Sequence, residues 1–260
     1  MTVPIIRAES DGVLKFTFNR PEKLNAINRE MVNALIQGVS DMEQRRDLRV
    51  MLVASTGRYF SSGSDLAEGV DNSENPPSVG RQWLHDHLQH LFARFERLEK
   101  PIVVAHQAMC MGGGLELSLS CDFRLASEEA AYSLPEIKMG LVPLSNGVSK
   151  LTRLCGPQWA KWMILAQEPI DAQRAHAIGL VQQVYPAAEF EERVEQFCLK
   201  LARQPPEAMA IAKIGIDITA ELGMQEARQV ERLCYSSLAT GQEGLTLRHE
   251  HFARVLKDRR

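Results

Sequence analysis

The sequence predicts an α/β protein with a layered core and a helical C-terminal section. Patterns typical of strands and helices alternate from the N-terminus, and the strand patterns cease beyond Pro186. The chain has 260 residues, of which 45% are hydrophobic, so it can bury a large core without disulfide support. We expect an α/β core over residues 1–200 and a helical region over residues 201–260.

The N-terminal half shows strand and helix patterns in turn. Val13 to Asn19 alternates apolar and polar residues, as a half-buried strand does. Asn28 is a suitable N-cap for a following helix, and Leu48 to Ser55 reads as a second strand. After the loop-like stretch from Asp71 to Gly80, apolar spacing predicts an amphipathic helix over Arg81 to Glu99.

The second half begins with a buried strand, Pro101 to Ala105, followed by a glycine turn and a short helix over Leu115 to Cys121. Further short elements are two strands, a helix and a strand, at 122–126, 130–134, 171–179 and 180–185. Helical patterns fill the remainder, at 188–203, 206–222, 225–240 and 243–257.

Charge and composition exclude several classes of protein. The 30 basic and 33 acidic residues are spread along the chain, so we expect no nucleic-acid partner. No segment has the length and apolarity of a membrane span, and the N-terminus lacks the apolar region of a signal peptide. The five cysteines form no Cys-x-x-Cys pair. We therefore expect a cytoplasmic protein with no membrane partner.

Three histidines, His85, His87 and His90, fall in one predicted helix. His85 and His87 diverge around a helix, so only His87 and His90 are neighbours, and no carboxylate or cysteine pattern completes a site. We expect no metal.

The run from Met111 to Glu116 places three glycines between a strand and a helix. Such a turn lets the backbone approach a ligand and presents free amide N–H groups to it. A second loop, Gly57 to Leu66, lacks the Gly-Lys-Ser/Thr of a phosphate-binding loop, so main-chain amides around Gly63 and Ser64 are its expected contribution. Neither turn alone distinguishes an oxyanion site from a packing solution.

Two glutamates stand near these turns. Glu116 lies in the first turn of an otherwise apolar helix, and Glu136 follows a strand in the turn Leu134-Pro135-Glu136. An apolar setting raises the pKa of a carboxyl group towards the range of a general acid or base.

Five segments in this order resemble the crotonase (enoyl-CoA hydratase/isomerase) superfamily, and the resemblance covers essentially the whole chain. The segments are NRPEKLNAI (19–27), GRYFSSGSDL (57–66), GGGLELSLSCDFRLAS (112–127), LPEIKMGLVP (134–143) and GLVQQV (179–184). The resemblance implies a spiral core of repeated ββα units, with C-terminal helices that serve in trimerisation and help to cover the acyl site.

The resemblance also implies residue roles. The backbone amides of Ser64 and Gly113 would hold the thioester oxygen, and Glu116 and Glu136 would carry out syn addition of water to a 2-enoyl-CoA. Lys23, Ser62, Ser64, Asp65 and Leu66 would bind coenzyme A, which is part of the substrate, and no prosthetic group is implied. A homotrimer or homohexamer is expected.

One departure leaves the reaction open. Where many hydratases have a glycine-rich stretch, this chain has Leu144-Ser145-Asn146-Gly147. The alternatives are an isomerase that uses Glu136 alone, another lyase of the superfamily similar to carnityl-CoA dehydratases, and a catalytically silent CoA-binding member.

Overall fold

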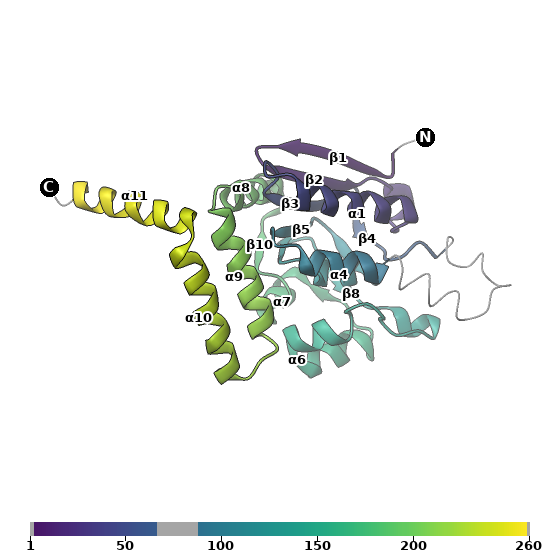
Figure 1. Cartoon of the computed structure of the whole chain (residues 1–260). Coiled ribbons are helices and arrows are strands. Elements are labelled where there is room, and N and C mark those ends of the chain that lie inside the picture. The colour runs from purple at the N-terminus through teal and green to yellow at the C-terminus, as the bar shows by residue number, and fades with distance from the viewer. Residues whose placement is uncertain (1–2, 67–87, 259–260) are drawn as a thin grey trace. The chain divides into compact units, whose positions relative to one another are not determined.

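The computed structural model describes residues 3–66 and 88–258 and divides the chain after Ala202 into two compact units. The first unit contains two β-sheets and the helices that pack on them, and the second is helical (Figure 1). The prediction of a mixed α/β protein with a helical C-terminal section is confirmed. The predicted loop from Asp71 to Gly80, with His85 and His87, lies outside the described residues.

The larger sheet has six strands and forms the centre of the first unit. Its order is β1 (Ile5–Ser10), β2 (Val13–Phe18), β3 (Val50–Ser55), β5 (Ile102–His106), β7 (Phe123–Ser127) and β10 (Gln183–Tyr185). β1 pairs antiparallel with β2, and the other pairs are parallel. Leu14, Phe16 and Phe18 of β2 are buried, as their alternation predicts.

A smaller sheet is built alongside from very short strands, in the order β4 (Tyr59–Ser61), β6 (Met109–Met111), β8 (Ala131–Ser133) and β9 (Ile170–Asp171). Three times, a strand of the larger sheet is followed after a short turn by one of the smaller sheet: β3 by β4, β5 by β6, and β7 by β8. This is the repeated unit of the expected spiral core. Because β4, β6 and β8 are parallel neighbours, their carboxyl ends meet at one edge.

The helices of the first unit pack on both faces of the larger sheet. α1 (Arg29–Gln44) begins at the predicted cap, where the Asn28 side chain accepts a hydrogen bond from Met31 N. α8 (Phe190–Ala202) packs on the opposite face through Phe190, Val194 and Cys198. The other α-helices are α4 (His90–Arg97), α5 (Gly113–Leu119), α6 (Ser149–Ile164) and α7 (Ala172–Ala177). Short 3-10 helices are η1 (Pro21–Lys23), η3 (Glu136–Met139) and η4 (Ala187–Glu189).

The second unit consists of α9 (Pro206–Thr219), α10 (Met224–Thr240) and α11 (Gln242–Asp258). α10 packs against both α9 and α11. In the described parts of the chain, no helix combines the length and the apolarity needed to cross a bilayer.

Candidate active site

Four residues predicted from the sequence come together at the carboxyl edge of the smaller sheet. Ser64 follows β4, Gly113 follows β6 and Glu136 follows β8, and these three strands are adjacent. Glu116 lies in the first turn of α5, the helix that begins directly after β6. The fold therefore assembles on one edge groups that lie far apart in the sequence.

The loops that carry Ser64 and Gly113 are in direct contact. A Cβ atom added to Gly113 would lie 3.2 Å from Ser64 N and 2.8 Å from Ser64 Oγ, so only glycine fits without displacing the neighbouring loop. Within residues 3–66 and 88–258, neither the Ser64 nor the Gly113 amide donates a hydrogen bond. Two backbone donors on neighbouring loops therefore have no partner in this part of the chain, as an oxyanion site would require.

Glu116 is only 7% exposed, although it carries an ionisable group. The pKa of its carboxyl group is raised to about 7, mainly by burial and in addition by the nearby charge of Glu136. Hydrogen bonds from backbone amides of Ser145, Gly147 and Leu144 act in the opposite direction and favour the charged form. The result is a carboxyl group that can both take up and release a proton near neutral pH.

Glu136 is 9% exposed and stands at the start of η3. Burial raises the pKa of its carboxyl group as well. Its Oε2 atom is buried and has no hydrogen-bond partner among the described residues. A buried oxygen without a partner is costly in a folded protein, and such atoms are often found where a substrate binds.

The loop from Pro143 to Gly147 holds Glu116 through its backbone. Ser145 N donates to Glu116 Oε1 over 2.7 Å. A Cβ atom at Gly147 would lie 2.4 Å from Pro143 Cβ and 3.0 Å from Glu116 Oε1, so this position also requires glycine. The Leu144 side chain is 53% exposed. Leucine is therefore compatible with this loop, because the main chain makes the contact to Glu116.

Sequence reasoning missed the residue that holds the first loop in place. Asn25 is fully buried in a left-handed conformation, with φ 53°. Its Nδ2 donates to the carbonyl oxygens of Thr56 and Tyr59, and its Oδ1 accepts from Arg20 N. Its backbone oxygen accepts from Ser61 Oγ. Asparagine tolerates this conformation better than most residues, which is the only signal in the sequence that marks the position.

Replacing Asn25 with alanine should lower the free energy of unfolding by roughly 2–4 kcal/mol, because buried backbone groups lose their partners. Denaturant titration measures the change. Asn33→Ala, at an exposed position of α1, is the matched control and should have little effect. Equal midpoints for the two variants would contradict the role assigned to Asn25.

The predicted coenzyme A residues lie on two adjoining loops. Lys23 is exposed at the end of η1, and Leu66 is 53% exposed. Ser62 N donates to Leu24 O over 2.9 Å, which joins the η1 turn to the second loop. Asp65 forms an ion pair with Arg20 over 2.8 Å, so its carboxylate contributes to joining the loops. These two contacts join the loops next to the Ser64 amide.

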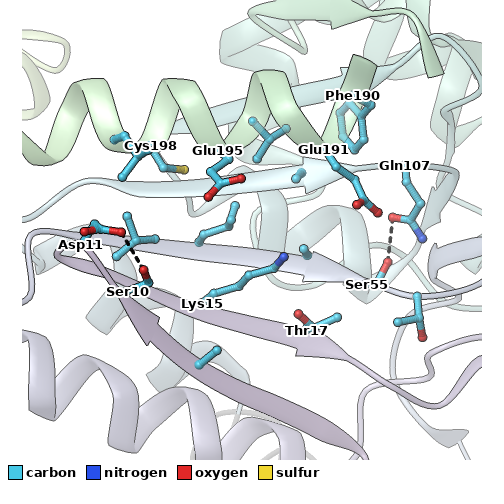
Figure 2. A pocket seen from close by; sticks show the side chains of 18 residues that line it. Ser10, Asp11, Lys15, Thr17, Ser55, Gln107, Phe190, Glu191, Glu195 and Cys198 are labelled. Atoms are coloured by element: carbon cyan, nitrogen blue, oxygen red, sulfur yellow. Dashed lines mark hydrogen bonds between the residues drawn. The ribbon is translucent and has the colours of Figure 1, made fainter. Parts of the chain in front are cut away.

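A separate cavity of about 400 Å³ lies between α8 and the larger sheet. Figure 2 shows Lys15 of β2 facing this cavity from the sheet, with Glu191 and Glu195 reaching towards it from α8. Neither Glu116 nor Glu136 lines it, so this cavity is distinct from the candidate active site.

In the part of the chain that the structure describes, no group of three or more His, Cys, Asp or Glu side chains is placed to hold an ion. The polar groups at the site are two carboxyl groups and backbone amides. These can transfer protons and stabilise a negatively charged oxygen.

The chain matches known proteins over most of its length. The family model described as enoyl-CoA hydratase/isomerase matches residues 8–254. The chain is 31% identical over 255 residues to a 2,3-dehydroadipyl-CoA hydratase of Escherichia coli K12, covering 98% of this chain and 96% of the relative. It is 30% identical to an enoyl-CoA isomerase/hydratase of Mycosarcoma maydis, and the match covers 90% of this chain and 88% of the relative.

The fold is also similar to solved structures. The crystal structure of an enoyl-CoA hydratase from Bacillus anthracis matches with a TM-score of 0.88 and 26% identity, covering 99% of this chain and 97% of the other. The resemblance predicted from the five sequence segments is confirmed.

Proposed function

Because the chain belongs to the enoyl-CoA hydratase/isomerase family, we propose that it is an enoyl-CoA hydratase that adds water reversibly to a 2-enoyl-CoA thioester. The observation that carries the proposal is the pair of buried glutamates beside two free backbone amides. An isomerase needs one acid–base group, whereas the addition of water across a double bond uses two.

In the proposed mechanism, the thioester oxygen lies between Ser64 N and Gly113 N. Attack of water at C3 moves electrons from the double bond onto this oxygen and produces an enolate. Hydrogen bonds from the two amides stabilise the developing negative charge, and the loss of one such donor typically costs about 3–4 kcal/mol of barrier.

The two glutamates divide the proton transfers. Ionised Glu116 orients the water and takes its proton as oxygen bonds to C3, and protonated Glu136 delivers a proton to C2 when the enolate collapses. Both groups act from one side of the planar substrate, so the addition is syn. Dehydration runs the same steps in reverse.

Binding of the substrate is proposed to involve both loops at the site. Lys23 would lie near the nucleotide phosphates, and Ser62, Asp65 and Leu66 would line the path of coenzyme A towards Ser64. We also propose that the protein is cytoplasmic and forms a homotrimer or homohexamer. Sedimentation of the purified protein would test the oligomeric state.

The decisive experiment incubates the pure protein with a panel of 2-enoyl-CoA thioesters that carry short, long, branched, aromatic and carnityl acyl groups. Loss of the conjugated thioester absorbance and a product heavier by one water would support hydration and identify the substrate class. The same product formed equally well by the Glu116→Gln variant would contradict the proposal.

A second candidate function is double-bond isomerisation through Glu136. The observation that favours it is the partnerless Oε2 of Glu136, since a single free carboxyl oxygen is sufficient to move a proton between C2 and C4. Deuterium exchange at these carbons without a hydrated product would identify the isomerase.

The pH dependence of hydration should be bell-shaped. Glu116 must be ionised, so kcat/KM should rise through about pH 7, the pKa of its carboxyl group. Glu136 must be protonated, and burial raises the pKa of its carboxyl group, so the rate should fall as the pH rises through that raised pKa. Because Glu116 and Glu136 interact, the apparent pKa values of the profile belong to the pair and not to either residue alone. A rate that is constant from about pH 6 to about pH 9 would contradict this assignment.

A further inference from the structure

Asn146 stands in the loop that holds Glu116 and has a left-handed backbone, with φ 77°. Its side-chain Nδ2 donates two hydrogen bonds, over 2.8 Å to Glu96 Oε1 and over 2.9 Å to Ser120 Oγ. Glu96 belongs to α4, and Ser120 is the C-cap of α5. One side chain therefore ties the loop to two helices.

The contacts of Asn146 connect to Glu116 from two sides. Ser120 Oγ donates to the backbone oxygen of Glu116 over 3.3 Å, so the hydroxyl that accepts from Asn146 also contacts the glutamate's own main chain. On the other side, the amide next to Asn146, Ser145 N, donates to Glu116 Oε1. Asn146, Ser120, Glu116 and Ser145 are therefore linked in a closed ring. Three hydrogen bonds and the peptide bond between Ser145 and Asn146 join them.

We propose that Asn146 is a positioning residue for Glu116: its side-chain amide fixes the loop whose backbone N–H groups orient the catalytic carboxylate. The proposal deepens the hydratase function and rests on it. The two side-chain hydrogen bonds of Asn146 go to Glu96 and Ser120 and not to the carboxylate of Glu116, so we infer that it acts through the loop.

Two charged side chains near this ring bear on the titration of Glu116. Lys150 of α6 contacts Glu96 Oε1 over 2.8 Å, the same oxygen that accepts from Asn146. Glu136 of η3 is the titratable group that raises the pKa of Glu116 by its charge. Release of the loop would weaken the backbone hydrogen bonds that favour the charged form of Glu116, so the pKa of Glu116 should rise.

The test compares three variants of the full chain. Asn146→Gly removes the side chain but keeps the left-handed conformation accessible, whereas Asn146→Ala also strains the backbone. Lys150→Met removes the ion pair with Glu96 and leaves the Asn146 contacts in place. Melting temperatures establish that each variant is folded at the temperature of the assay.

In steady-state hydration, Asn146→Gly is expected to shift the acidic limb of kcat to higher pH while KM stays within about twofold. A shift of about one pH unit lowers the ionised fraction of Glu116 at pH 7, and with it kcat, about fivefold. Asn146→Ala should shift the acidic limb of kcat at least as far. In Lys150→Met this limb should lie at the same pH as in the wild type. An acidic limb of kcat at the wild-type pH in Asn146→Gly would overturn the proposal.

A second measurement does not depend on the reaction. The ¹³C resonance of the Glu116 carboxyl group, assigned with Glu116→Gln, is titrated in the substrate-free wild type and in Asn146→Gly. A higher pKa in the variant supports the proposal, and identical titrations overturn it. If the wild type hydrates no thioester, the proposed function fails, but this titration still decides whether Asn146 positions Glu116.

Discussion

Replacing Glu116 with glutamine is expected to lower kcat for hydration by about 10²–10⁴-fold, the range found for removal of a general acid–base group. Glutamine has the same shape as glutamate, and its side-chain oxygen can still accept the hydrogen bond from Ser145 N. It cannot take a proton from water. KM should change little, because the amides of Ser64 and Gly113 remain in place. Steady-state rates measured with the best thioester of the panel provide the test.

The stability of the same variant provides a control on folding. The pKa of Glu116 in the folded protein, about 7, lies above its ordinary value, so folding favours the protonated form. The stabilising contribution of this group is complete at low pH and is lost as the pH rises through about 7. Glu116→Gln has no such titration, so its free energy of unfolding relative to the wild type should increase between about pH 5 and about pH 8.

The outcome also separates the two candidate functions. A Glu116→Gln enzyme that loses hydration but still exchanges deuterium at C2 or C4 would show that Glu136 works alone on the enolate. A variant that hydrates at the wild-type rate would remove Glu116 from the mechanism. Loss of activity with a lower melting temperature at every pH would instead indicate damage to the fold.

The long, periodic elements of this fold could be predicted from the sequence, and the short ones could not. α1 was found from its Asn28 cap and its repeated apolar spacing. β4, β6 and β9 have only two or three residues each, too few to show an alternation. The sequence does not predict α6, because this helix is kinked at Gly156, where φ is 80°, and contains Pro157. β1 was also missed, since five of its six residues are exposed.

Two element ends differ from the prediction because local backbone hydrogen bonds at helix ends set them. The helix after the glycine turn starts at Gly113, two residues before the predicted Leu115, because Leu115 N and Glu116 N both donate to Gly112 O. The strand predicted from Leu180 begins only at Gln183, since Leu180 N instead closes the end of α7 by donating to Ala175 O. Both contacts are local, but the apolar spacing on which the predicted ends rest does not report them.

For the candidate site, the two glutamates and the two glycine-loop amides could be predicted, whereas the groups that hold them in place could not. Glu116 and Glu136 stand out because each is a charged residue beside a tight turn. The contribution of the Pro143–Gly147 loop lies in its amides, and Leu144 gives no sign of it, since its side chain is exposed. Asn25 and Asn146 look like ordinary loop residues until the three-dimensional structure shows what their amides contact.

Replacing Gly113 with alanine is expected to lower kcat/KM by about 10²–10³-fold, comparable to the loss of one oxyanion donor. The added Cβ would stand 3.2 Å from Ser64 N, at the amide that the thioester oxygen is proposed to reach. The methyl group would therefore obstruct the place where the negative charge develops. Unlike Glu116→Gln, this variant leaves both glutamates in place, so the apparent pKa values of the pH profile should be retained while the maximum falls.

Two further variants separate obstruction of the amide from a clash with the serine side chain. Ser64→Ala keeps the backbone N–H and should change kcat/KM by less than about threefold, since the proposed donor is the main chain. In Gly113→Ala combined with Ser64→Ala, the 2.8 Å approach to Ser64 Oγ is removed but the 3.2 Å approach to Ser64 N remains. The double variant should stay as slow as Gly113→Ala. Recovery of wild-type activity in it would mean that the hydroxyl clash, and not access to the amide, caused the loss.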